Sequence, residues 1–298
     1  MVLVKVGDEM SDFRELVALV ALLRYGSFQK SQMGLRQRLI DGDLPSQILL
    51  EESDPELLRQ SASRDVEQWV VAGEHPLSWL DVDYPQQLRE VHDFPPVIFV
   101  RGRLVNCDQG VCIVGSRDAG QPSVDAAREI ARLVVDAGWT VVSGLARGID
   151  TAAHSEALTH GGRTVAVIGN GIDRVYPAEN RQLQHVIEQR GLVLSQFWPE
   201  TSPTKFSFPM RNAVMSAYAS ATIIVSAKES SGTRHQAKQV AAHGRPLVVS
   251  RSVYEHTTWG RKLVDDPSVL ARVAYSVDEA VSHAMDLATF SVSDLALA

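Results

Sequence analysis

The feature that most constrains the fold of this chain is a strand-and-helix alternation that fills residues 111–250. Short apolar runs rich in β-branched residues end in glycine or serine, and amphipathic helical stretches separate them. The runs are VCIVGS (111–116), TVVSG (140–144), TVAVIG (164–169), LVLS (192–195), TIIVS (222–226) and PLVVS (246–250). Strands that are apolar throughout are buried on both faces, which predicts a parallel sheet between two layers of helices. The expected fold class is α/β, with an extended Rossmann-like parallel sheet.

The segment before this alternation has helical spacing instead. Apolar residues and turn signals predict a small all-α unit, with helices at 12–26, 27–40, 44–51 and 62–73. A connector at 75–104 contains Phe94-Pro95-Pro96, which forces extended backbone, and then the strand-like run VIFVRG. The predicted domains are a helical domain at 1–75, a Rossmann-like domain with its lead-in strand at 76–287, and a tail at 288–298.

The charge is distributed unevenly along the chain. The 298 residues carry a net charge of −7, but residues 101–250 hold 16 Lys and Arg against 12 Asp and Glu. A basic middle between acidic flanks favours an anionic ligand bound by the central domain. No window approaches the roughly 18 apolar residues of a membrane helix. The N-terminal segment carries acids and no cleavage pattern, and the two cysteines form no CxxC, so we expect a soluble cytoplasmic protein.

Polar loops follow the predicted strands, and in a parallel sheet such loops gather at one edge, where ligands bind. The first loop is Gly115-Ser116-Arg117. Its glycine lets backbone N–H groups approach an anion, and its serine and arginine add donors. The dinucleotide fingerprint GxGxxG is absent, which argues against NAD or FAD, and we expect no cofactor.

The second loop brackets an arginine with two glycines. Gly144, Arg147 and Gly148 precede a predicted helix, and this arrangement is typical of an anion cradle at a helix N-terminus. Asp150 is interpreted as structural, either as the helix cap or as an orienting acceptor. His154, one turn later, is interpreted as a packed helix histidine rather than an acid–base residue.

Two further loops carry candidate phosphate contacts. Gly169, Asn170 and Gly171 follow the third strand, and Asn170 can be a polar reader or a turn residue. The loop after the fifth strand presents hydroxyls and amides at a helix N-terminus, which predicts an oxyanion nest or an ordinary helix cap, at Ser231, Gly232 and Thr233.

The loop after the fourth strand interleaves basic and aromatic residues. Lys205 precedes Phe206 and Phe208, and Arg211 and Asn212 lie in the first turn of the next helix. An arginine there opposes the helix dipole, so helix stability does not explain it. Charge for phosphates and rings for stacking are what single-stranded nucleic acid needs. The two phenylalanines are equally compatible with a core position.

Taken in order, these loops resemble one family. VGSR, VVSGLARGIDTAAHSEAL, VAVIGNGIDRVYPAENRQL, FPMRN and SSGT are similar to the motifs of the DprA/Smf family of DNA-processing proteins, and so are the connector and residues 259–281. The resemblance covers roughly residues 78–285. It implies an extended Rossmann fold, single-stranded DNA bound in a basic pocket, loading of a RecA-type recombinase and a role in natural transformation. It also implies phosphate contacts by Arg117 and Arg211, and Lys205, in the loop that precedes FPMRN, is a further candidate. We further expect a homodimer.

The sequence departs from the family pattern at three positions, Gln196, Ala213 and Gln236, where the family usually has glutamate, arginine and threonine. Gln236 also bears on an enzymatic alternative. Phosphoribohydrolases on a related fold use a glutamate three residues after a Gly-Thr pair, and an amide cannot replace that carboxylate. The nine histidines give no metal spacing. We therefore expect no catalytic residues and no metal; a nucleotide-binding sensor stays open as a further alternative.

Overall fold

The computed structural model describes the backbone of residues 6–295 and the side chains of residues 12–289. The chain forms two compact units. The N-terminal unit comprises the residues up to Tyr84 together with His92–Val100, and the sheet unit comprises Pro85–Val91 and the residues from Arg101 onward.

The N-terminal unit is built from helices and one strand pair, which are α1 (Val6–Arg24), α2 (Met33–Ile40), α3 (Pro45–Leu49), α4 (Pro55–Val71), β1 (His75–Ser78) and β2 (Val97–Gly102). The two strands run antiparallel. The predicted second helix starts later than expected, because the N–H and hydroxyl of Ser27 bind Glu52 at 2.9 and 2.6 Å instead of capping a helix. The strand pair belongs with the helices, since Trp69 of α4 packs edge-on against Phe99 of β2 at 5.1 Å. The compact unit therefore extends past the predicted boundary at residue 75.

The sheet unit contains the predicted parallel sheet. Its strands are β3 (Gly110–Gly115), β4 (Thr140–Ser143), β5 (Thr164–Val167), β6 (Leu192–Ser195), β7 (Ala221–Ser226), β8 (Leu247–Ser250) and β9 (Ala271–Ala274). They lie in the order β6-β5-β4-β3-β7-β8-β9, and every neighbouring pair is parallel. All six strand predictions in 111–250 are confirmed, and so is the α/β fold class.

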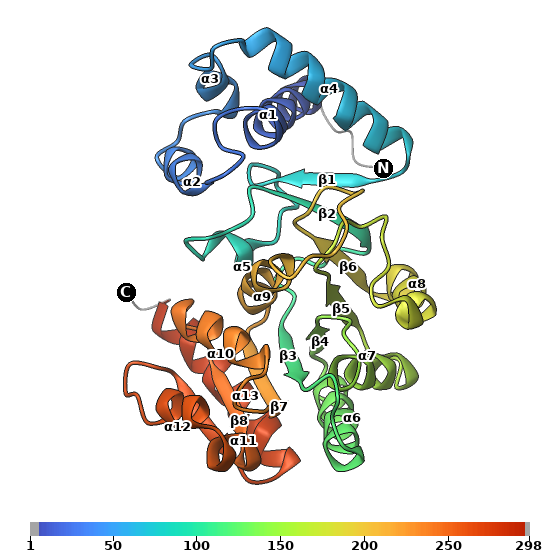
Figure 1. The fold of residues 1–298 in the computed structure, drawn as a ribbon, viewed down its shortest axis with the longest axis vertical. Coiled ribbons are helices and arrows are strands. Elements are labelled where there is room, and N and C mark those ends of the chain that lie inside the picture. Colours follow the sequence, from blue (N-terminus) through green and yellow to red (C-terminus); the bar gives the residue numbers. More distant parts are fainter. Residues whose placement is uncertain (1–5, 296–298) are drawn as a thin grey trace. The chain divides into compact units, whose positions relative to one another are not determined.

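Helices lie between and around these strands (Figure 1): α5 (Gln86–Arg89), α6 (Gln121–Asp136), α7 (Ile149–Thr159), η1 (Ala178–Asn180), α8 (Arg181–Arg190), α9 (Ser207–Tyr218), α10 (Thr233–Ala242), α11 (Arg251–His256), α12 (Thr258–Val264) and α13 (Val277–Leu295). Helices α6, α7 and α13 share one core with Val111 and Ile113 of β3. Side chains alternate along a strand, so Val114 points to the other face, where α9 and α10 pack together. Helix α13 continues through Leu295, where a tail was predicted from residue 288.

The strand order fixes where a ligand can bind. From β3 the chain builds the sheet outward through β4, β5 and β6, whereas β7, β8 and β9 extend it on the other side of β3. Loops leaving β3 and β7 therefore diverge and open a crevice at the carboxyl ends of these two strands. In the part of the chain that the structure describes, no helix is long and apolar enough to cross a membrane.

Candidate nucleic-acid interface

A cleft of about 500 Å³ lies at this switch point. Its size is within the range of small-ligand sites. Ten of the sequence-predicted residues line it, which are Gly115, Ser116, Arg117, Lys205, Phe208, Arg211, Asn212, Ser231, Gly232 and Thr233. The structure therefore gathers the loops that follow β3, β6 and β7 around one hollow, although they are far apart in sequence.

Three cations of the cleft are exposed and have no carboxylate partner among the described residues. The Arg117 guanidinium lies 5.0 Å from the ring centre of Phe208, and the Lys205 ammonium lies 5.0 Å from that of Phe206. The third cation, Lys228, follows β7 and lines the same hollow. The sequence reasoning missed Lys228, although a lysine two residues after a strand of a parallel sheet is a recognisable signal. With Arg211, the cleft holds four cations against the two carboxylates of Asp118 and Asp150, and a concave site with an excess of positive charge attracts anionic ligands.

Arg211 lines the cleft in a different way. Only 5% of its surface is exposed, and its Nη1 donates to the carbonyl oxygens of Gly144 and Val167, the latter at 2.8 Å. Burial lowers the pKa of the Arg211 guanidinium. Burial also raises the pKa of the Asp150 carboxyl, and the positive charge of Arg211 partly offsets that rise. Arg211 thus ties β4 and β5 together at the floor of the cleft, which adds a structural role to the predicted phosphate contact.

The glycine-bracketed arginine lies beside the cleft. Gly148 has φ +75°, and a Cβ there would lie under 3.0 Å from the carbonyl oxygens of Ser116 and Arg117. Glycine therefore allows this loop to approach the loop after β3. Arg147 lines a smaller adjoining hollow with Gly144 and Gly169, and its Nε lies 3.4 Å from Glu179.

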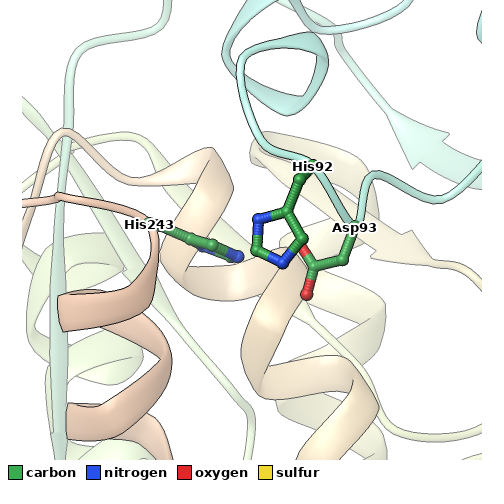
Figure 2. Close-up of side chains that lie close together, drawn as sticks. All are labelled: His92, Asp93 and His243. Carbon is green, nitrogen blue, oxygen red and sulfur yellow. The ribbon is translucent and has the colours of Figure 1, made fainter. Parts of the chain in front are cut away.

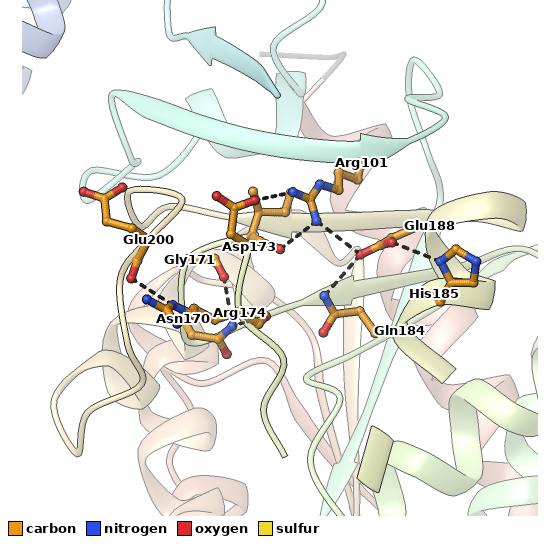
Figure 3. A network of polar contacts seen from close by, with 10 residues as sticks. Arg101, Asn170, Gly171, Asp173, Arg174, Gln184, His185, Glu188 and Glu200 are labelled. Atoms are coloured by element: carbon orange, nitrogen blue, oxygen red, sulfur yellow. Dashed lines mark hydrogen bonds and ion pairs between the residues drawn. The ribbon is translucent and has the colours of Figure 1, made fainter. Parts of the chain in front are cut away.

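The loop after β5 points inward instead. Asn170 is 1% exposed, and its Nδ2 donates to the carbonyl oxygens of Gly171 and Arg174 at 3.0 and 2.7 Å. Figure 3 shows Arg101 holding the same loop, where its Nη1 donates to the Ile172 carbonyl at 3.0 Å. Neither Asn170 nor Gly171 lines the cleft. Asn170 is thus a turn residue here, and a contact from it to a ligand would require this loop to rearrange.

The residues interpreted as structural in α7 are buried. The N-cap of α7 is Gly148, and Asp150 is the second residue of the helix. Its carboxylate accepts a hydrogen bond from the Ala146 N–H at 3.3 Å. It is thus an orienting acceptor and not the cap. His154 is fully buried with its Nδ1 2.7 Å from the Thr164 hydroxyl, and burial lowers its pKa to about 3. The packed-histidine interpretation is confirmed.

The loop after β7 is fixed at one end and open at the other. Glu229 accepts from the Thr258 N–H at 2.7 Å and from its hydroxyl. Helix α10 begins at Thr233, and its N-cap Gly232 supplies no side-chain cap. The ordinary Ser/Thr cap is therefore not what the structure shows. The Arg234 and His235 N–H groups donate to the carbonyl oxygens of Ser231 and Gly232 at 3.2 and 3.0 Å, and both of these acceptor residues line the cleft. Gln236, a departure from the family pattern, also lines this cleft.

The nine histidines were expected to give no metal site. Figure 2 shows His243 at the carboxyl end of α10, and its Nδ1 lies 2.6 Å from the Ser216 hydroxyl. His92 and Asp93 are consecutive residues in the loop between α5 and β2 (Figure 2). Taken separately, neither unit brings three His, Cys, Asp or Glu ligand atoms together among its described residues. The absence of a metal stays a prediction.

Comparison with known proteins places these features in a family. The family model described as DNA recombination-mediator protein A matches residues 75–283. Protein Smf of Synechocystis is 40% identical over 172 residues, which are 56% of this chain and 43% of that protein. DNA processing protein DprA of Streptococcus pneumoniae is 39% identical over 173 residues, which are 57% of this chain and 60% of that protein. The matched segments thus span about half the length of these relatives.

The solved structures agree on the fold. The X-ray structure of DprA from S. pneumoniae superposes with a TM-score of 0.67 at 26% identity and covers 92% of this chain and 94% of that one. The DprA structure from Helicobacter pylori, described for its single-stranded DNA binding mode, has a TM-score of 0.62 at 24% identity and covers 72% of this chain and 96% of that one. At that identity it supports the fold alone. The family model spans most of the chain, and the chain therefore belongs to the DNA recombination-mediator protein A family, the DprA/Smf family that its motifs resemble.

Proposed function

We propose that this chain binds single-stranded DNA in the switch-point cleft, with Arg117, Lys205 and Lys228 neutralising phosphates. The observation that carries the proposal is the set of exposed cations that form no ion pair with a carboxylate of the described residues, beside the half-buried ring of Phe208. Phosphates supply charge for the cations, and unpaired bases supply faces for the rings. Relatives that carry the name DNA processing protein DprA support a DNA ligand.

The biological role that we propose is to protect the strand and pass it to a RecA-type recombinase in the cytoplasm, with the protein acting as a homodimer. Addition of the chain to a single strand should then shorten the lag before a RecA-type recombinase assembles on it. We further propose that the chain is not an enzyme, because Gln236 stands where the related phosphoribohydrolases carry their glutamate. The carboxylates that line the cleft, Asp118 and Asp150, lie at other positions. Release of free base from nucleoside monophosphates would contradict this.

The test of the DNA ligand is a titration by strand length. Thymidine monophosphate, short thymidine oligonucleotides of increasing length and the matched duplex are titrated against the full chain. A strand binder gains affinity with length and prefers the single strand, because a crevice at a sheet edge presents no helix to a duplex groove. A nucleotide sensor would bind the monophosphate as tightly as the longest strand, and that result would replace the proposal.

A further inference from the structure

Gln236 is an unusual residue in the wall of the cleft. It lies one turn into α10, lines the cleft, and is only 2% exposed. Neither its Nε2 nor its Oε1 has a hydrogen-bond partner among the described residues. The hydroxyl of Ser231, another lining residue, is likewise buried and unpartnered.

A buried amide without partners is unfavourable for the folded protein, because it has given up its hydrogen bonds to water. Such a group needs a partner that the folded chain does not supply, and Gln236 lines a cleft in which a ligand can supply one. The amide offers a donor and an acceptor side by side. A phosphate accepts only, so it would bind Nε2 and leave Oε1 facing an anion. The edge of a nucleobase carries an adjoining donor and acceptor, and it satisfies both atoms at once.

We propose that Gln236 binds the Watson–Crick edge of one unpaired base held in the cleft, with Nε2 donating to the base and Oε1 accepting from it. This rests on the proposed binding of single-stranded DNA. The amide atoms are covered in the structure, so a base meets them when the side chain turns outward about its flexible bonds. Because the amide can also turn over, it serves the donor–acceptor pair of every natural base in either order. The cleft thereby captures a base without preference for its identity.

The test changes one atom of the amide. In Gln236→Glu both oxygens accept and neither donates. Guanine offers two adjoining donors, N1–H and N2–H, whereas thymine offers one donor between two acceptors. We expect the variant to bind a thymidine strand at least about tenfold more weakly than the same strand with isolated guanines, whereas the unmodified chain binds both alike. Gln239→Glu adds the same charge to the same helix outside the cleft lining, and it should leave the ratio near one.

Gln236→Leu supplies a second readout. It replaces an unpartnered amide with an apolar side chain of similar size. The melting temperature should therefore stay constant or rise, while the affinity for single strands falls about tenfold. A lower melting temperature with unchanged affinity would show a purely structural glutamine, held for example by a buried water. An unchanged thymine-to-guanine ratio in Gln236→Glu overturns base reading while leaving DNA binding intact. Failure of the unmodified chain to bind any single strand overturns both proposals.

Discussion

Replacement of Arg211 by alanine tests whether this residue has a structural role besides the phosphate contact that the sequence predicts. From the sequence, Arg117→Ala and Arg211→Ala should both weaken binding without unfolding the protein. In the structure, Arg211 is buried and its guanidinium holds the carbonyl oxygens of Gly144 and Val167 beside the Asp150 carboxyl. Arg211→Ala orphans two buried acceptors at about 1–3 kcal/mol each, and it removes the positive charge that partly offsets the burial of the Asp150 carboxyl. We expect Arg211→Ala to lower the free energy of unfolding by about 3–5 kcal/mol.

Urea denaturation followed by circular dichroism measures this change, with Arg117→Ala as the control from the same cleft. The side chain of Arg117 is exposed and lies over the ring of Phe208, so its loss should change the free energy of unfolding by about 0.5 kcal/mol or less. The two variants should therefore differ by several kcal/mol in stability. Equal stability of both variants would refute the structural role assigned to Arg211.

Three further changes test other parts of the sheet unit. In Gly171→Ala the new Cβ would lie under 3.0 Å from two backbone carbonyl oxygens, so thermal unfolding should show a loss of about 1–3 kcal/mol, whereas Gly232→Ala, with nothing within 4 Å, should show none. Arg101→Met leaves the Ile172 carbonyl without its charged donor and should lower stability by about 1–3 kcal/mol in the same assay; an unchanged melting temperature would contradict the network of Figure 3. His154 is held neutral with a pKa of about 3, but in the unfolded chain it takes up a proton near pH 6.5, so stability falls as pH drops from 6.5 towards 3. Between pH 6.5 and 5 this contributes about 2 kcal/mol, and His154→Gln should remove that part of the pH dependence of unfolding.

The sequence predicted the sheet because its signal is local. Each strand from β3 to β8 is an apolar run bounded by glycine or serine, and burial on both faces leaves no competing pattern. The N-terminal helices were less well defined. The start of α2 depends on Ser27 binding Glu52, a contact across 25 residues that no local pattern reveals. The unit boundary likewise depends on the contact between Trp69 and Phe99.

The cleft could be predicted as a set of loops but not as a set of contacts. Strand order brings the loops after β3 and β7 together, so residues such as Arg117 and Thr233 were identified from position alone. The sequence does not show which arginine is exposed. Arg211 lies on α9 and is buried where that helix packs on the sheet, whereas Arg117 lies in the loop after β3 and is exposed. Asn170 was ambiguous for the same reason, because the partners of its amide are fixed only in the folded loop.

The most direct test of the account is the salt dependence of single-strand binding. Each phosphate neutralised on a single strand contributes about 0.7 to the slope of log affinity against log salt, so three cleft cations predict a slope of about −2. A variant with alanine at all three should lose most of this slope; these residues are Arg117, Lys205 and Lys228. The matched control removes three cations that carboxylates already pair outside the cleft, which are Arg128, Arg132 and Arg251, and it should keep the slope. Equal slopes for the cleft variant and the unmodified chain would contradict the claim that this cleft holds the strand.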